Sequence, residues 1–534
     1  MIPMLIAPAE AGFYAPTKVH TIQLKLTQEE WDSMTPTRSG GGPGGGGPGG
    51  PGGGPMNGNE FPEIKSTVTI DGKEYVVGLR FKGNSSYMSS SRGMKRPFKI
   101  DLNQFVKDQT ISGLTKINLN NNFSDRTQIR ETLAYEIFRR MGVPSPKTSL
   151  AKVTLNLEGE DKVLGLYTLA EQLDTNFLKE RFGTSEGMLL KPEGARGGIG
   201  YLGDSWNRYE KAYDPKGKPK TAEKERFIAF AKLVTQADDA TFQKEISSYL
   251  DIDSFAKFLA ATVVTSNGDS LLSMGHNFYI WLNPKTNKFH YLPWDLNMAF
   301  GGFPIGDAVK LSVKKPYAGE SKLLDRFLAL PEGRAAYEKA CRDGAKILTE
   351  LNTLHDQVAA AAKPIAALDP KEAMGFGPPQ GGPGGGGFPG GPDGQGGFPG
   401  GPPQGGQGGF GGPPPGGGFG GSGGFQGGPG GFGPPQGGGF PGGPGGGFPG
   451  GPGGGGRRGG GPGGPGGMGG TTDLKKFFAQ RSASILAQLD GKEEGVTPQG
   501  GGPGGGGFPG GPGGPGGFRP GGFGGPPPDF GGGF

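Results

Sequence analysis

The sequence predicts an α+β fold that is interrupted by long tracts of glycine and proline. Alternating, strand-like stretches fill the chain up to about residue 173, whereas helical periodicity dominates residues 222–266 and 321–367. The 116 glycines and 51 prolines are concentrated in three tracts, so the sequence between them has an ordinary mixed composition. An amphipathic helix follows the longest tract, which indicates that the folded domain resumes there.

The first elements are strands joined by recognisable turns. The stretch "TIQLKL" alternates apolar and polar positions, and Thr27 can cap the short helix that follows it. Two further alternating strands flank Asp71-Gly72, a dipeptide typical of tight hairpin turns. The stretches "KRPFKIDLNQF" and "LTKINLNNN" supply more strands.

The clearest helix is "SDRTQIRETLAYEIFRRMG", which Ser124 can cap at its start and Gly142 can end. A hairpin comes next and leads into the short helix "TNFLKERFG". A later strand pair, "HNFYIWL" and "KFHYLPWD", turns at Asn283-Pro284 and ends at Asp295. This second strand pair therefore delivers a carboxylate to a turn.

The glycine- and proline-rich tracts set the domain organisation. Residues 375–470 are almost wholly Gly, Pro, Phe and Gln, a composition that cannot bury a core. The helix after them is too short to be stable alone, so we expect it to pack on the main domain. The sequence divides into an N-terminal segment (1–17), a main domain (18–374) with an insertion at about 39–55, a disordered tract (375–470), a returning helix of the main domain (471–492) and a disordered tail (493–534).

Composition excludes several classes of function. The net charge of +5 is mild and no Lys/Arg stripe follows one helix face, so no nucleic-acid partner is expected. A single cysteine excludes a disulfide framework, and four histidines far apart make a zinc site improbable. No stretch approaches the roughly 20 apolar residues that span a bilayer, so no transmembrane segment is expected.

The first residues of the chain do not decide in which cellular compartment the protein is located. "MIPMLIAPAEAGFY" has a short apolar run and small residues but no basic leader. It fits either the remnant of a secretory signal or an apolar N-terminal strand. A secreted or cell-surface location and a cytoplasmic one both agree with this pattern.

Three residues form the strongest candidate site. Asp269 lies in a glycine-containing loop after a helix, Asn277 follows eight residues later, and Asp295 ends a strand. A loop acid, an amide and a strand-end acid form the pattern that phosphoryl transfer needs, because one carboxylate orients the attacking hydroxyl while the others hold magnesium. The alternative is two structural carboxylates that cap turns.

Several long motifs in one order resemble the CotH kinase family (spore coat protein H-like). They are "VGLRFKGNSS", "INLNNNFSDRTQIRETLAYEIFRRMGVPSP", "GLYTLAEQLDTNFLKERFG", "GMLLKPEG" and "HNFYIWLNPKTNKFHYLPWDLNMAFGGF". The resemblance covers roughly residues 18–370 and the helix at 471–490. It implies an atypical protein-kinase-like fold that binds ATP and magnesium and phosphorylates serine or threonine on a protein substrate.

The resemblance also implies residue roles. Asp295 corresponds to the magnesium-binding acid, Asp269 to the catalytic-loop acid and Asn277 to the accompanying amide. Many relatives read Trp-Asp-Leu-Asp where this chain has Asn297, so a second-metal role at that position is in doubt.

The nucleotide-binding residues are less sharply defined. "RFKGNSSYMSSSRGMKRPFKID" reads as strand, Gly/Ser loop and strand, an arrangement that can lay backbone N–H groups over phosphates. Either Lys95 or Lys99 is then the phosphate lysine and Glu131 its partner, unless the lysine is a solvated strand residue. Glu171 is a candidate for the adenine side or a helix cap, and Lys191 is a further phosphate candidate.

Two short motifs point elsewhere and are set aside. "GDSL" at residues 268–271 matches a serine-esterase signature with Ser270 as nucleophile, yet no histidine here has an aspartate three residues before it. "GIGYLG" at residues 198–203 matches a dinucleotide fingerprint, but no apolar helix follows, so it reads as a loop. The main rival function is a non-catalytic surface or matrix protein whose kinase-like domain is a binding module.

Overall fold

The computed structural model describes residues 12–38, 59–90, 93–195, 198–370 and 473–498, all within one compact unit of mixed helix and strand. The predictions about residues 1–11, the insertion at about 39–55, the tract at 375–470 and residues 499–534 of the predicted tail (493–534) lie outside the described residues.

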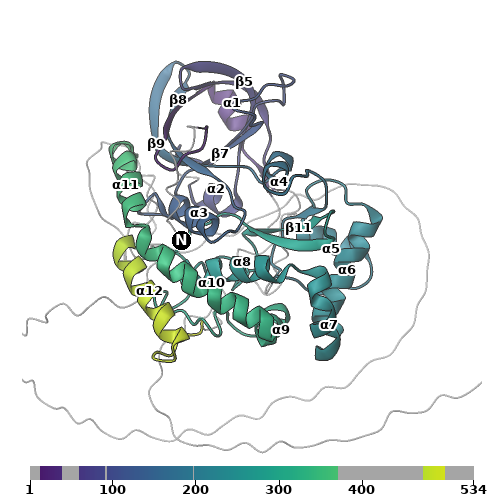
Figure 1. Ribbon diagram of the computed structural model, residues 1–534. Coiled ribbons are helices and arrows are strands. Elements are labelled where there is room, and N and C mark those ends of the chain that lie inside the picture. Colours follow the sequence, from purple (N-terminus) through teal and green to yellow (C-terminus); the bar gives the residue numbers. More distant parts are fainter. Residues whose placement is uncertain (1–11, 39–58, 91–92, 196–197, 371–472, 499–534) are drawn as a thin grey trace, which may run out of the picture. The chain divides into compact units, whose positions relative to one another are not determined.

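Seven strands close into a barrel, drawn in purple and blue in Figure 1. Neighbouring strands are antiparallel except for β1 and β8, which run parallel and close the barrel. In barrel order the strands are β1 (Val19–Leu26), β4 (Ile64–Ile70), β5 (Lys73–Phe81), β6 (Phe98–Asp101), β7 (Lys116–Asn120), β9 (Glu160–Ala170) and β8 (Thr148–Leu157).

The barrel strands separate apolar from polar residues by simple alternation. Phe81, Phe98 and Leu119 point into the barrel and are fully buried in its core. The register pairs Arg80 with Lys99, which places these polar side chains together on the outer face. The outer face of the barrel therefore presents polar side chains that can contribute to a functional site.

The remaining strands form two smaller sheets. β10 (Leu189–Leu190), β11 (Phe278–Asn283) and β12 (Lys288–Pro293) form an antiparallel sheet, while β2 (Thr37–Arg38) pairs with β3 (Asn59–Glu60). The β11–β12 hairpin turns just after Asn283, as the sequence predicts.

Helices contact both the barrel and the sheet of β10, β11 and β12: α7 and α8 contact β12, while α3 and α11 contact the barrel strands β8 and β9. The segment predicted as helical at 222–266 breaks into three helices, because Asp238 and Asp251 each cap a new start with the side chain. The helices are α1 (Gln28–Ser33), α2 (Asn84–Ser89), α3 (Arg130–Arg140), α4 (Thr175–Phe182), α5 (Trp206–Tyr213), α6 (Thr221–Gln236), α7 (Asp239–Tyr249), α8 (Ile252–Val264), α9 (Lys322–Ala329), α10 (Pro331–Glu350), α11 (Asn352–Ala366) and α12 (Leu474–Leu489).

Helix α3 begins later than the sequence suggests. The proposed cap at Ser124 is wrong: the helix starts at Arg130, whose backbone N–H donates to Asp125 Oδ2 at 2.8 Å. Asp125 also accepts from the Arg130 guanidinium at 3.3 Å. Asp125 takes the place of Ser124 because its two carboxylate oxygens accept hydrogen bonds from both the first backbone N–H of the helix and the buried Arg130 side chain.

Helix α12, yellow in Figure 1, lies along α10 and also contacts α8. Arg481 on α12 is fully buried and donates to the carbonyl groups of Val309, Leu311 and Val263. No helix among the described residues is long and apolar enough to cross a membrane.

Candidate active site

Asp295 lies two residues beyond the end of β12, in a turn with left-handed backbone conformation (φ +51°). Its backbone N–H donates to the Tyr135 hydroxyl at 3.0 Å, and the N–H of Trp294 donates to the Asn277 carbonyl at 3.1 Å. None of the described residues donates a hydrogen bond to the Asp295 carboxylate or forms an ion pair with it. A half-buried carboxylate without a direct partner is costly, which is expected where a ligand supplies that partner.

Lys82 lies directly after β5 and precedes Gly83. Its Nζ donates to Asn120 Oδ1 at 2.6 Å, and Asn120 Nδ2 donates to both Glu131 carboxylate oxygens at 3.0 and 2.9 Å. The Lys82 ammonium also lies 5.6 Å from the centre of the Trp294 ring, next to Asp295. Asn120 therefore joins the lysine on the barrel to the glutamate on α3.

The charges of these three groups influence one another. Burial lowers the pKa of Lys82 from its usual value to about 8, although Asp295 and Glu131 act in the opposite direction. Burial raises the pKa of the Glu131 carboxyl, and Asp295 adds to the rise. Burial likewise raises the pKa of Asp295, which Lys82 opposes. Such perturbed values in one place are typical of functional sites.

Asp269 is held from both sides in the loop that follows α8. His276 Nε2 lies 2.7 Å from Asp269 Oδ1, and Asn277 Nδ2 donates to Asp269 Oδ2 at 3.0 Å. Burial lowers the pKa of His276, but the hydrogen bond and charge of Asp269 outweigh burial, so the pKa is raised. Asn277 also has left-handed backbone conformation (φ +61°), and strain of this kind gathers at functional sites.

Lys191 contributes a further positive charge. It lies directly after β10 and pairs with the carboxylate of Glu193. Its charge acts on both Lys82 and Asp295, which places it at the edge of the same cluster.

The two lysines favoured by the sequence have other partners than Asn120 and Glu131. Lys95 forms a buried ion pair with Asp369 at 2.5 Å, and both side chains are 5% exposed. Lys99 lies on the outer face of β6, where its Nζ donates to Gln172 Oε1 at 2.9 Å. Lys99 therefore borders the cluster, and Lys95 serves a contact between α11 and the barrel.

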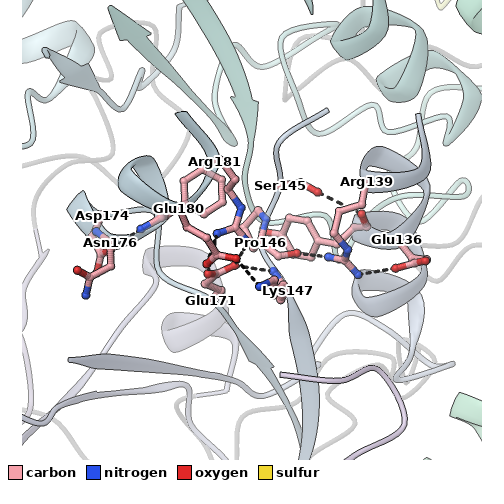
Figure 2. A network of polar contacts seen from close by, with 12 residues as sticks. Glu136, Arg139, Ser145, Pro146, Lys147, Glu171, Asp174, Asn176, Glu180 and Arg181 are labelled. Atoms are coloured by element: carbon pink, nitrogen blue, oxygen red, sulfur yellow. Dashed lines mark hydrogen bonds and ion pairs between the residues drawn. The ribbon is translucent and has the colours of Figure 1, made fainter. Parts of the chain in front are cut away.

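Glu171 forms a separate polar network, which Figure 2 shows. Arg181 holds its carboxylate with two hydrogen bonds of 3.0 and 2.6 Å, and the backbone N–H of Lys147 donates to it at 2.9 Å. Through these contacts Glu171 links the segment after β9 to Arg181 on α4 and to the backbone of Lys147. We assign it no direct ligand contact.

The structure thus brings together Asp269, Asn277, Asp295, Glu131 and Lys191 from the predicted set. It adds Lys82, Asn120, Tyr135 and His276, which the sequence reasoning missed. The signal for Lys82 was present in "RFKGNSS", where a lysine ends a strand immediately before a glycine loop. The adjacent Gly83 has φ +72°, a conformation that favours glycine at the start of the loop.

The donor set is compatible with magnesium. The described residues contain no group of three or more His, Cys, Asp or Glu side chains that could hold a metal ion. Magnesium, however, is usually bound by one or two protein oxygen ligands together with substrate phosphates and water. Within the described part of the chain, the Asp295 carboxylate has no direct partner, and Asn277 uses its NH₂ group on Asp269, which leaves its side-chain carbonyl oxygen available.

A partly buried lysine linked to a glutamate, a loop acid with an amide, and a strand-end acid together match the pattern of residues that phosphoryl transfer uses. Residues 79–374 match the family model described as CotH kinase protein. This match covers more than half of the sequence, and the chain belongs to the CotH kinase family.

Known proteins resemble the chain to different extents. The inner spore coat protein H of Bacillus subtilis (strain 168) is 23% identical over 313 residues, which cover 58% of this chain and 82% of the relative. Among solved structures, the HipA–HipB operator complex of Shewanella oneidensis MR-1 aligns with a TM-score of 0.26 and 10% identity, covering 57% of this chain and 62% of the other. The Helicobacter pylori proinflammatory kinase CtkA aligns with a TM-score of 0.20 and 10% identity, covering 62% and 95%.

Proposed function

We propose that this protein is an ATP- and magnesium-dependent kinase of atypical protein-kinase-like fold. Its substrate is a protein, and the acceptor is a serine or threonine hydroxyl. The observation that carries the proposal is the proximity of Lys82, Asp269 and Asp295, which come from three separate segments: the charges of Lys82 and Asp269 both act on Asp295, and Asn277 contacts both Asp269 and the residue before Asp295. Lys82 and Asp295 have no ion-pair partner among the described residues. The negative phosphates of a bound triphosphate would pair with Lys82, and its metal ion would pair with Asp295.

Each residue then has a distinct role. Lys82, held by Asn120 and indirectly by Glu131, donates to phosphate oxygens. Asp295 and the Asn277 carbonyl oxygen would hold magnesium, which when bound neutralises phosphate charge. Lys191 lies at the edge of the site and adds positive charge.

Asp269 is proposed to orient the acceptor. In the transfer, the acceptor oxygen bonds to the γ-phosphorus while the bond to the β–γ bridging oxygen breaks and ADP leaves. The hydroxyl proton passes to the Asp269 carboxylate, whose orientation is fixed by His276 and Asn277.

The proposal also includes a location for the protein. The Bacillus relative is named as an inner spore coat protein, which favours a surface-associated location for this chain as well.

The direct test is to incubate the full chain with labelled ATP, magnesium and a serine-rich acceptor protein. We expect label on serine or threonine, and a rise in melting temperature with ATP and magnesium. If neither label transfer nor a nucleotide-dependent rise is observed, the kinase proposal fails and a non-catalytic binding module is favoured.

A further inference from the structure

The outer face of the barrel beside the candidate active site carries an excess of positive charge. The register places Lys99 opposite Arg80 on β5 and opposite Asn118 on β7, and opposed residues point to one face. Lys82, two residues beyond Arg80, follows the same alternation. The charged groups of this face are Arg80, Lys82, Lys99 and Lys116, with Glu63 and Asp101 as the carboxylates.

Two of the four cations have carboxylate partners and two do not. Arg80 lies 3.9 Å from Glu63, and Lys116 lies 3.2 Å from Asp101. Lys82 and Lys99 form no ion pair among the described residues. Burial, followed by the charges of Arg80, Lys82 and Lys116, lowers the pKa of Lys99 to about 7.

Lys99 is held in place by two neutral amides. Gln172 Oε1 accepts from Lys99 Nζ at 2.9 Å and from Asn118 Nδ2 at 3.1 Å. Asn118 is 1% exposed and donates also to the Ala170 carbonyl at 3.1 Å. One N–H bond of the ammonium is therefore used, and the other two meet no acceptor among the described residues. An oriented, uncompensated donor of this kind is suited to a ligand acceptor.

The position of Lys99 indicates which part of a nucleotide it meets. Asp295 is a main charge acting on Lys82, but it is absent from the main charges acting on Lys99. Lys99 instead contacts Gln172, in the segment that leads from β9 to α4. Lys82 therefore lies nearer to Asp295, and Lys99 lies nearer to the segment that joins β9 to α4.

We propose that Lys99, oriented by Gln172 and Asn118, donates a hydrogen bond to an acceptor of the nucleobase and so determines which nucleotide the protein prefers. Bases differ in where they present acceptors and amino groups, so a fixed hydrogen-bond donor favours an edge that presents an acceptor over one that presents an amino group. This inference rests on the proposed function.

The experiment measures dissociation constants of the full chain for ATP, GTP, UTP and inorganic tripolyphosphate, each with magnesium. Lys99→Met removes the donor, and Lys99→Gln retains a neutral donor. Lys116→Met is the matched control, because Lys116 lies on the same face but already has Asp101 as its partner. Melting temperatures of all variants establish that each is folded.

We expect Lys99→Met to raise the dissociation constant of the preferred nucleotide about tenfold or more and to reduce the difference in affinity between nucleotides with different bases. Tripolyphosphate affinity should stay within about twofold, because that ligand has no base. Lys99→Gln should fall between wild type and Lys99→Met, and Lys116→Met should match wild type.

Two results overturn the inference while leaving the kinase proposal intact. In one, tripolyphosphate and nucleotide affinities fall equally in Lys99→Met, which makes Lys99 a phosphate-binding cation. In the other, the preference among bases is the same in Lys99→Met as in wild type. If wild type binds none of the four ligands, the proposed function itself fails, and this inference fails with it.

Discussion

The backbone N–H of Asp295 donates a hydrogen bond to the hydroxyl of Tyr135 at 3.0 Å. Tyr135 lies four residues after Glu131 on α3, so both side chains project from the same face of one helix. Through Glu131 and Asn120 the helix also supports Lys82. Helix α3 therefore positions the lysine and the strand-end acid of the candidate site together.

The first prediction concerns this hydrogen bond. Tyr135→Phe leaves the Asp295 N–H without its acceptor, so we expect lower turnover and a loss of roughly 1–3 kcal/mol in unfolding free energy. Tyr291→Phe is the matched control, because the buried Tyr291 hydroxyl has no hydrogen-bond partner in the described part of the chain. Equal urea-unfolding and kinase results for the two variants would contradict the role of Tyr135.

The two acids should respond differently to substitution. Asp295→Asn removes a carboxylate that has no direct partner among the residues the structure describes, so the ligand-free protein should melt at the same or a higher temperature. The rise in melting temperature with ATP and magnesium should disappear, because a neutral amide does not balance a divalent ion. Thermal unfolding with and without both ligands measures this effect.

Asp269→Asn should give the opposite pattern. It weakens the pair with His276 and so lowers the melting temperature of the ligand-free protein, while nucleotide binding stays near wild type and turnover falls. A variant that loses metal-dependent nucleotide binding as completely as Asp295→Asn would contradict the separation of roles.

Stability should depend on pH through Lys99. Its pKa is about 7 in the folded protein against a usual value of 10.5, so the unfolded chain binds the extra proton between these values. Stability therefore rises with pH across this window, and the full penalty of the buried charge is present below about pH 7. Lys99→Met should be more stable than wild type near pH 7, and the two should converge toward pH 10.5.

Urea unfolding at several pH values between about 7 and 10 measures this difference, which is at most about 1.4 kcal/mol per pH unit for one proton. The charged groups near Lys99 (Arg80, Lys82, Lys116, Asp101 and Glu63) are the same in both proteins. Parallel pH curves for wild type and Lys99→Met would show that Lys99 titrates normally.

The sequence predicted much of the site, and the misses have a physical reason. Asp269 and Asp295 stand out because each follows a regular element and enters a turn. Lys82 was overlooked in favour of Lys95 and Lys99, since all three lie in or beside one strand–loop–strand segment. Only the barrel register and the distant partner Asp369 separate them, and neither follows from local alternation.

The buried pair of Lys95 and Asp369 should be important for stability. Asp369 Oδ1 also accepts from the Leu166 N–H at 2.8 Å, so the pair fixes the end of α11 against β9. Lys95→Met alone leaves an unpaired buried carboxylate and should cost about 3–5 kcal/mol. The double variant Lys95→Met/Asp369→Asn should recover much of that loss, because the amide oxygen can still accept from Leu166.

Urea unfolding of the single and double variants checks this prediction. The exposed pair between Lys475 and Asp356 is the control, and Lys475→Met should cost less than about 1 kcal/mol. A double variant that is less stable than Lys95→Met would show that the charge pair itself contributes favourably.

The last prediction concerns α12 and the segment before it. We propose that residues 375–470 are an insertion into the kinase-like domain and that α12 belongs to that domain. Arg481 and Gln488 support this proposal, because they bond to the segment at residues 309–313 that follows the Asp295 turn. Loop-closure free energy changes by only about 0.6 kcal/mol per doubling of length, so a shorter connection should be tolerated.

Deleting residues 385–460 leaves 31 residues (367–384 and 461–473) to join α11 to α12, and the melting temperature and nucleotide binding should stay near those of wild type. Ending the chain before α12 should instead lower the melting temperature strongly. That truncation exposes the apolar surface of α10 and leaves three buried carbonyl groups without their arginine donor. A truncated chain with an unchanged melting temperature would show that α12 is not part of the folded domain.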